Sequence, residues 1–416
     1  MLHAYLVPVC WLCLTAIVAC QPASRKDLVS GSPRGDVAAL QLVESWPLET
    51  SLDDPSVADA TDVWVAMISA ATKTLDVEQF YAVSSDSHPG MERVLAAIEQ
   101  AVSRGVVVRI IVDKSFYKRM PEVPDRLGRI KGVQLRHLDL RALTGGVQHA
   151  KFFIVDGRDA FIGSQNFDWR SLAHIVELGV RVRLPAAVDA LAAVFETDWR
   201  LAGGMPIAQA RGSYAGAGKP IHTRYGGAPA TVSVVLSPKP LLLDGAAWNL
   251  AHLLAAIDGA TRRIRVQLLS YSTRNYDKTT FVKLDAALER AAERGVSVQL
   301  MVADWNAKKG RIEALKRLQE LSNVTVKMVT IPAHSSGFIP YARVTHSKLM
   351  TVDGRWSWLG TSNWSGGYFT QSRNVGLVVE SRPFARDLDR HFERLWGQPY
   401  AEVVRPEREY VPPRRR

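Results

Sequence analysis

Cysteine is almost absent from this chain of 416 residues, and its three cysteines, Cys10, Cys13 and Cys20, all lie within the first twenty positions. The rest of the chain therefore has neither a disulfide framework nor a thiolate metal site. Acidic calcium-binding loops, a glycine-rich P-loop and a Gly-x-Ser-x-Gly elbow are also missing. We expect chemistry that uses neither a metal nor another cofactor. The hydrophobic share of 47% and the charged share of 22% are ordinary globular values, which argues against disorder and against a polytopic membrane protein.

The amino terminus holds the one long apolar run. Residues 4–19 match a signal-peptide core and are shorter than the roughly 20 residues of a membrane-spanning helix. We predict a lipoprotein-type signal peptide over residues 1–19, lipidation at Cys20 and a flexible tether over residues 20–40. An ordinary cleaved signal or an uncleaved anchor stays open. The protein is then exported, either as a lipoprotein on the periplasmic side of a bacterial membrane or as a secreted protein.

The pattern His-x-Lys-x-x-x-x-Asp occurs twice, 197 residues apart. Its members are His149, Lys151 and Asp156 in the first copy, and His346, Lys348 and Asp353 in the second. Side chains two residues apart on a strand point to the same side, so each copy offers one imidazole and one ammonium to a shared cleft. Two facing half-sites supply a nucleophile, a general acid and fixed positive charge. These are the groups that cleavage of a phosphodiester in water requires.

A second sign of duplication lies upstream of each motif. A periodic apolar helix is followed by a glycine and a β-branched run, with Gly105 in the first half and Gly295 in the second. A glycine just past a helix end is the usual left-handed cap, and the run after it predicts a buried strand. Alternating helices and strands in both halves predict an α/β layered architecture.

The same patterns divide the chain. We predict two similar domains, residues 41–205 and 231–405, joined by a glycine- and alanine-rich linker over 206–230 and followed by a basic tail over 406–416. The net charge of +11 is uneven, because residues 41–205 carry −4 and residues 206–416 carry +14. A basic half attracts polyanions such as anionic lipid headgroups or nucleic acid, although a solvated basic face kept for solubility is an equal alternative.

Each motif is followed by Gly-Ser/Thr-x-Asn, and with this addition the chain resembles the phospholipase D superfamily. The added residues are Gly163, Ser164 and Asn166 in the first half, and Gly360, Thr361 and Asn363 in the second. The segments around the second motif resemble the branch of lysosomal phospholipase D-like exonucleases and poxvirus envelope proteins. The resemblance implies two phospholipase D-like α/β/α domains about a pseudo-twofold axis, with the active site at their interface.

The resemblance also implies residue roles. One histidine forms a phosphohistidine and the other acts as acid and base; the family pattern makes His149 the nucleophile and His346 the acid/base. Lys151 and Lys348 would hold the non-bridging oxygens. The phosphate-binding set would be completed by neutral hydrogen-bond donors, namely Ser164, Asn166, Thr361 and Asn363.

Two pairs of polar residues need separate treatment. Asp156 and Asp353 complete the motifs and are counted with the catalytic residues, but strand alternation turns them away from phosphate and favours capping of the following Gly-Arg turn. Glu177 and Asn374 occupy equivalent positions and break the symmetry. We expect Glu177 beside His149, fixing its tautomer, which weakly supports His149 as the nucleophile; a surface glutamate is the alternative.

The substrate is less determined than the reaction. Trp356, Trp358, Trp364, Tyr368 and Phe369 cluster after the second motif and either fill a core or contact bases or lipid. A phospholipid-directed hydrolase or phosphatidyltransferase is our first hypothesis, since an exported, membrane-tethered protein meets phospholipid. A nuclease acting on single-stranded nucleic acid by the same mechanism is the second, and an inactive binding protein the third. Nothing in the sequence calls for an obligate protein partner.

Overall fold

The computed structural model describes residues 1, 38–212, 219–243, 245–275 and 277–416. The predicted signal peptide, Cys20 and most of the predicted tether lie outside the described residues. Residues 38–416 form one compact unit. Within the described residues, no helix combines the length and apolar character needed to cross a membrane.

The first half is built around a sheet whose described strands follow the order β2-β1-β10-β8-β7-β3-β5-β6. These strands are β1 (Leu40–Ser45), β2 (Ala58–Asp59), β3 (Thr74–Gln79), β5 (Val107–Asp113), β6 (Val133–Leu138), β7 (Phe152–Val155), β8 (Asp159–Gly163) and β10 (Glu177–Val182). A separate short pair consists of β4 (Ala82–Val83) and β9 (Phe167–Asp168). The helices of this half are α1 (Ala60–Ser69), α2 (Gly90–Ser103), α3 (Lys114–Tyr117), α4 (Glu122–Gly128), α5 (Leu140–Thr144), α6 (Trp169–Ala173), α7 (Pro185–Ala202) and α8 (Ile207–Ala210).

The second half repeats this plan in the order β11-β12-β19-β18-β17-β14-β15-β16-β20, with β13 beside β12. Its strands are β11 (Ile221–Tyr225), β12 (Ala228–Ser237), β13 (Ala247–Trp248), β14 (Arg263–Leu268), β15 (Ser297–Ala303), β16 (Val324–Val329), β17 (Leu349–Val352), β18 (Trp356–Gly360), β19 (Asn374–Glu380) and β20 (Ala401–Val403). Its helices are α9 (Asn249–Asp258), α10 (Lys283–Glu293), α11 (Ile312–Gln319), α12 (Gly366–Thr370) and α13 (Arg382–Trp396), and two 3₁₀ turns are η2 (Lys239–Leu241) and η3 (Asp304–Asn306).

The predicted duplication is confirmed strand by strand. Strands β3, β5 and β6 are parallel neighbours, as are β14, β15 and β16. Strands β5 and β15 have the same sequence of exposed and buried positions. The glycines that precede them have the positive φ angles expected of left-handed caps, 89° at Gly105 and 85° at Gly295. The prediction of an α/β fold made of two similar halves is therefore correct.

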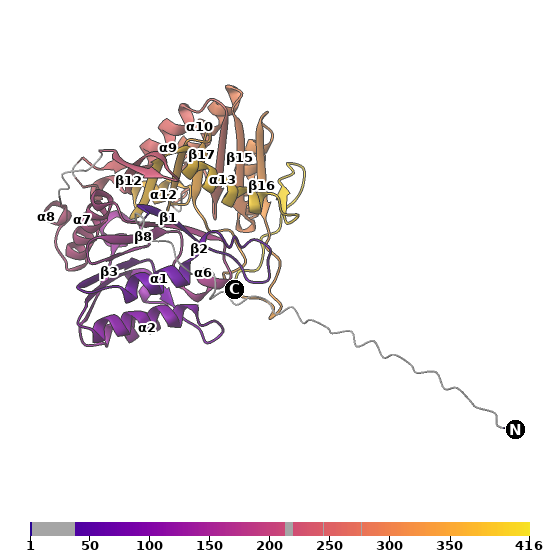
Figure 1. Cartoon of the computed structure of the whole chain (residues 1–416). Coiled ribbons are helices and arrows are strands. Elements are labelled where there is room, and N and C mark those ends of the chain that lie inside the picture. Colours follow the sequence, from indigo (N-terminus) through magenta and orange to yellow (C-terminus); the bar gives the residue numbers. More distant parts are fainter. Residues whose placement is uncertain (2–37, 213–218, 244, 276) are drawn as a thin grey trace. The chain divides into compact units, whose positions relative to one another are not determined.

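Three large apolar clusters hold the layers together. Helices α1 and α2 cover one face of the first sheet, and α9, α10 and α11 cover one face of the second (Figure 1). Between the two sheets, α7 and α13 share a core to which both halves contribute, including Phe195 and Phe392. Because this central core joins both halves, the two motif strands β7 and β17 belong to one packed unit.

The interval 206–230, which we predicted as a linker, differs in part from that prediction. Strands β11 and the start of β12 lie inside it, so the second sheet begins at Ile221. Gly226 and Gly227 have positive φ angles of 55° and 78° and form the tight turn of a β-hairpin. A Gly-Gly pair is compatible with a linker and with a hairpin turn. The pairing of the flanking strands, which the sequence does not reveal, distinguishes the two.

Candidate active site

The two motifs meet through a pair of equivalent backbone contacts. Gln148 forms a parallel bridge to Arg373, and Val176 forms one to Thr345. Adding the offset of 197 to Gln148 and Val176 gives Thr345 and Arg373, so exchange of the halves converts one bridge into the other. Gln148 and Thr345 directly precede the two motif histidines. Each is thus paired with the residue that directly precedes β19 or β10 in the opposite half. This crossing is the pseudo-twofold relation expected from the sequence.

The histidine backbones take part in the same crossing. The amide of His149 donates to the carbonyl of Arg373 at 2.9 Å, and the amide of His346 donates to the carbonyl of Val176 at 2.8 Å. Both histidines are buried, at 5% and 8% exposure. The structure therefore places both motifs along one seam between the halves.

Each imidazole has a side-chain partner from the other motif's neighbourhood. His149 Nδ1 lies 3.1 Å from Asn374 Oδ1, and His346 Nδ1 lies 2.8 Å from Glu177 Oε2. Our expectation that Glu177 stands beside His149 is therefore wrong. The first residues of β10 and β19 lie at the seam, where each reaches across to the motif of the opposite half.

The partners also determine which imidazole nitrogen faces the cleft. Asn374 Nδ2 donates hydrogen bonds to the carbonyls of Tyr368 and Ser372, and Asn374 Oδ1 accepts one from the Thr361 hydroxyl at 2.9 Å. Its Oδ1 is thus an acceptor, and His149 Nδ1 carries the hydrogen. The Glu177 carboxylate imposes the same tautomer on His346. In both rings Nε2 keeps its lone pair for chemistry.

Burial and charge then separate the two histidines. Burial lowers the pKa of His149 well below its usual value, and Lys151, Lys348 and His346 lower it further. Burial also lowers the pKa of His346, but Glu177 opposes that shift. Burial would raise the pKa of Glu177, yet His346 and Lys348 hold it below the usual range, so the carboxylate is ionised. His346 is the better proton carrier of the two.

Each lysine contacts the backbone of its own motif histidine, and both residues of each pair lie just before β7 or β17 instead of within the strand. Lys151 Nζ donates to the carbonyl of His149 at 2.7 Å, and Lys348 Nζ donates to the carbonyl of His346. Burial, with the charge of Lys348, lowers the pKa of Lys151 well below its usual value; burial lowers the pKa of Lys348 to about 7, against the effect of Glu177. An anionic phosphodiester would oppose these shifts and stabilise the charged form of both buried lysines.

The four neutral residues expected at phosphate divide into two pairs. The hydroxyl of Thr361 gives its single hydrogen to Asn374 and accepts from the amide of Val375, and the hydroxyl of Ser164 likewise bonds both backbone groups of Leu178. In this arrangement both hydroxyls are used within the protein, which favours a supporting role for Ser164 and Thr361 beside the residues that hold the histidines; a phosphate contact stays a prediction.

The two asparagines keep a role at the seam. Asn166 Nδ2 lies 3.3 Å from the hydroxyl of Tyr81, and Asn363 Nδ2 lies 3.3 Å from the hydroxyl of Tyr368. Asn166 Oδ1 is buried and has no partner among the described residues. The asparagines therefore stay candidates for substrate contact.

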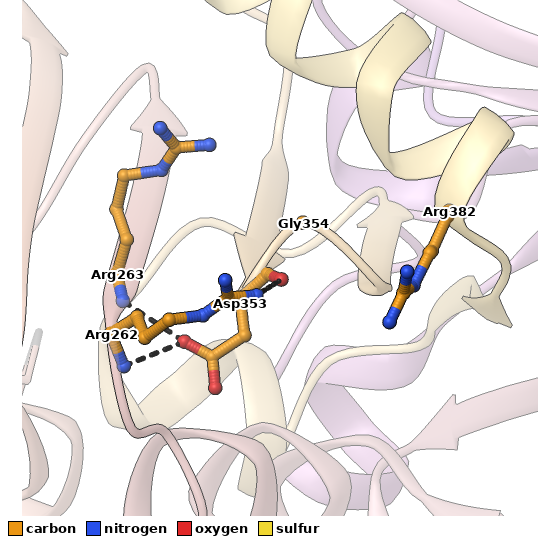
Figure 2. A pocket seen from close by; sticks show the side chains of 5 residues that line it. All are labelled: Arg262, Arg263, Asp353, Gly354 and Arg382. Atoms are coloured by element: carbon orange, nitrogen blue, oxygen red, sulfur yellow. Dashed lines mark hydrogen bonds between the residues drawn. The ribbon is translucent and has the colours of Figure 1, made fainter.

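Asp156 and Asp353 lie at the far ends of their motif strands. Asp353 accepts from the amides of Arg262 and Arg263 at 2.8 and 2.9 Å (Figure 2). These three residues line a pocket of about 470 Å³. Strand β17 separates Asp353 from Lys348, a distance of about 16 Å at 3.3 Å per residue. The separation and the bonds to backbone amides favour a structural role for this carboxylate over a catalytic one.

Asp156 has the equivalent position in the first half. Its carboxylate accepts from the amides of Thr72, Lys73 and Thr74. Burial would raise its pKa, but the Thr72 hydroxyl and these amides lower the pKa to about 2. Both aspartates thus cap the loop before β3 or β14, which corrects our assignment to catalysis and to the Gly-Arg turn.

Aromatic rings surround His149. Its ring lies 4.8 Å from that of Phe80 and 5.0 Å from that of Tyr368, between centroids, and Lys151 Nζ lies 4.9 Å from the Phe80 centroid. Phe80 was missed from sequence, because it lies outside the motif; its position directly after β3, beside the motif strand β7, is the signal that could have found it. Of the aromatic cluster noted in the sequence, Trp358, Trp364 and Phe369 are buried in the core.

The described residues contain no group of three or more His, Cys, Asp or Glu side chains that could hold a metal ion. The arrangement instead offers two imidazoles with free Nε2 atoms and two buried lysines around one seam. Such a set can attack, bind and protonate a phosphodiester.

Comparisons with known proteins agree with this arrangement. Residues 64–199 and 253–396 both match the family model described as cardiolipin synthase, PLD-like domain. The protein named 5'-3' exonuclease PLD3 from Rattus norvegicus is 32% identical over 410 residues, covering 89% of this chain and 81% of that protein. Phospholipase D Z from Dictyostelium discoideum is 29% identical over 388 residues, covering 88% of this chain and 91% of that protein.

A solved structure shows the same fold. The phosphatidylserine synthase of Haemophilus influenzae Rd KW20 has a TM-score of 0.57 at 13% identity, over 83% of this chain and 85% of that chain. The similarity extends through both halves, as expected for a shared architecture.

Proposed function

Because the chain belongs to the phospholipase D superfamily of phosphodiester-cleaving enzymes, we propose that it is a nuclease that removes nucleotides from the 5' end of single-stranded nucleic acid. The observation that carries the reaction is the crossed pair of contacts, Asn374 to His149 and Glu177 to His346. Those contacts aim two free Nε2 atoms into one seam.

The two partners support different roles for the histidines. A neutral amide beside His149 leaves this buried ring uncharged and nucleophilic. The carboxylate beside His346 stabilises an imidazolium, which is the form a general acid needs. His149 is thus the nucleophile and His346 the acid/base, as expected from the sequence. The reason differs, because Glu177 contacts the acid/base His346 and not the nucleophile.

The reaction then has two displacements. Nε2 of His149 bonds to phosphorus as the bond from phosphorus to the leaving oxygen breaks, and His346 gives its proton to that oxygen. His346 next takes a proton from water, whose oxygen bonds to phosphorus as the phosphorus–nitrogen bond breaks. Lys151 and Lys348 hold the non-bridging oxygens through both steps.

The relatives favour nucleic acid over the phospholipid that we placed first. The relative most similar in identity among those named above is an exonuclease, and residues 206–416 carry a net charge of +14. A polyanionic strand matches that charge. Export and a lipid anchor at Cys20 remain compatible with this substrate and are part of the proposal.

Phospholipid hydrolysis is the second candidate, because a relative named Phospholipase D Z matches this chain over 91% of its own length.

The purified chain would be assayed on a 5'-labelled oligonucleotide and on phosphatidyl vesicles, with His149→Ala and His346→Ala as controls. We expect mononucleotide release from the oligonucleotide, and none from either variant. Vesicle hydrolysis with an intact oligonucleotide would reverse the ranking, and full activity in His149→Ala would refute the mechanism.

A further inference from the structure

Arginines near the carboxyl end of the chain pack against an aromatic surface that the catalytic scheme does not use. The amide of Tyr341 donates to the carbonyl of Arg415 at 3.0 Å, and Arg416 Nε donates to the Tyr341 hydroxyl at 2.5 Å. The guanidinium of Arg415 lies 5.4 Å from the Trp305 ring centroid, and that of Arg414 lies 4.3 Å from the Phe338 ring centroid. These contacts hold the segment in place beside η3 and the loop before the second motif.

Arg311 belongs to the same region, because it lies between η3, the turn that carries Trp305, and the start of α11. Burial lowers the pKa of Arg311, Tyr368 opposes the shift and Arg415 adds to it, so Arg311 lies within electrostatic range of both. Tyr368 in turn packs against His149, with 5.0 Å between ring centroids. Arg311 therefore has both the nucleophile's aromatic neighbour and one carboxyl-terminal arginine among the groups that act on its charge.

A second connection comes from the first half. The guanidinium of Arg170 lies 5.8 Å from the Tyr341 ring centroid and pairs with Asp168. Asp168 accepts from the hydroxyl of Tyr81, which is also bonded to Asn166 of the seam. The end of the chain lies beside α6, the helix that carries Arg170 (Figure 1). This series of contacts links the surface to Asn166 at the seam through residues of the first half.

The positive charge on this surface is exposed and is not paired with Asp or Glu side chains of the described residues. Arg414, Arg415 and Arg416 are exposed, as are the neighbouring Lys308 and Lys309. None of these five residues forms an ion pair with an Asp or Glu side chain within the described part of the chain. A basic face that serves solubility alone has no need of planar rings between its charges, whereas single-stranded nucleic acid is bound by that combination.

We propose that Trp305, Arg311, Tyr341 and Arg414–Arg416, here named the basic track, bind the nucleic acid strand beyond the nucleotide being cleaved. The arginines would contact successive phosphates, and the two rings would stack on bases. This inference rests on the proposed nuclease function and adds where the rest of the strand lies. It predicts that the track contributes to the binding of long strands and little to that of short ones.

The test uses the whole chain and a double substitution, Arg415→Ala with Arg416→Ala. The matched control is Arg129→Ala with Lys131→Ala, which also removes two exposed positive charges, near the amino-terminal end of β6. KM and kcat would be measured on 3-nucleotide and 20-nucleotide strands. Strand binding would be measured separately by fluorescence anisotropy in a His149→Ala background, so that binding is read without cleavage.

For the track variant we expect KM on the 20-nucleotide strand to rise about tenfold. The slope of log affinity against log salt should fall by about 0.7 for each phosphate that the variant no longer neutralises. KM on the 3-nucleotide strand should change by less than about twofold in the same protein. The control variant should behave as the unaltered chain on both strands.

Other outcomes overturn the inference. If KM and anisotropy on the 20-nucleotide strand are unchanged, the basic track does not bind the strand. If KM rises equally on both strands, these arginines act at the catalytic centre. Reduced binding to phosphatidylglycerol vesicles with unchanged strand binding would assign the surface to membranes. If the unaltered chain cleaves no strand, the proposed function fails, and the anisotropy comparison still decides whether the track binds nucleic acid.

Discussion

Replacing Glu177 by glutamine tests the assignment of the two histidines. The buried carboxylate lies 2.8 Å from His346 Nδ1, and the glutamine carbonyl can accept the same hydrogen while its charge is lost. An adjacent opposite charge changes a pKa by about 1–3 units, and each unit equals about 1.4 kcal/mol. The pKa of His346 should therefore fall by about that amount, because Glu177 is the group that opposes the effect of burial.

The assay is the pH dependence of kcat/KM. If His346 must be protonated to act as the acid, activity falls as pH rises through its pKa, and Glu177→Gln should move this falling limb to lower pH by about 1–3 units. At neutral pH the variant should lose roughly tenfold to a thousandfold in kcat/KM. The rising limb, which reports deprotonation of the nucleophile, should not move.

The pseudo-symmetric position provides the matched experiment. Asn374→Asp would place a carboxylate 3.1 Å from His149 Nδ1, raise the pKa of that histidine and move the rising limb to higher pH. The reasoning is refuted if Glu177→Gln moves the rising limb and Asn374→Asp the falling limb, since the roles of His149 and His346 would then be reversed.

Three further predictions concern the frame around the site. Asp353→Asn should lower the free energy of unfolding in urea by about 1–3 kcal/mol and leave kcat/KM within about twofold; a larger loss of activity than of stability would return Asp353 to the catalytic residues. Burial lowers the pKa of His174 to about 4, below its usual 6.5, so stability should decline as pH falls from 6.5 toward 4, and thermal melts of His174→Asn should show a flatter decline. Gly146→Ala would place a Cβ 2.3 Å from the Gln371 backbone across the seam, so melting temperature and kcat should both fall. Gly212→Ala, whose nearest contact is 3.6 Å, is its control, and equal effects of the two would contradict a tight seam.

Much of the site was predictable because its signals are local. The spacing of His149 and Lys151 predicted one imidazole and one ammonium at a shared cleft, although both residues precede β7, and repetition at an offset of 197 identifies the equivalent pair. The glycine caps and buried strands likewise depend on neighbouring residues. These features predicted the α/β halves and the four central residues of the site.

The errors share one physical origin. Glu177 is 169 residues from His346 in sequence, and only the crossing of β10 and the second motif brings them together. Ser164 and Thr361 were predicted at phosphate from the motif, whereas tertiary hydrogen bonds engage both hydroxyls within the protein. The residue type determines which hydrogen bonds a side chain can form, whereas the fold determines which of them it forms.

The sequence by itself determined the repeated motif, the layered fold and the class of reaction, because strand periodicity and repeat spacing act over a few residues. Only the tertiary structure decided which partner each imidazole receives, which carboxylates serve the backbone, and that arginines near the carboxyl end lie close to the seam. Those contacts join segments that are far apart in sequence. Which of them form depends on the packing free energy of the whole fold, and local sequence patterns do not contain that information.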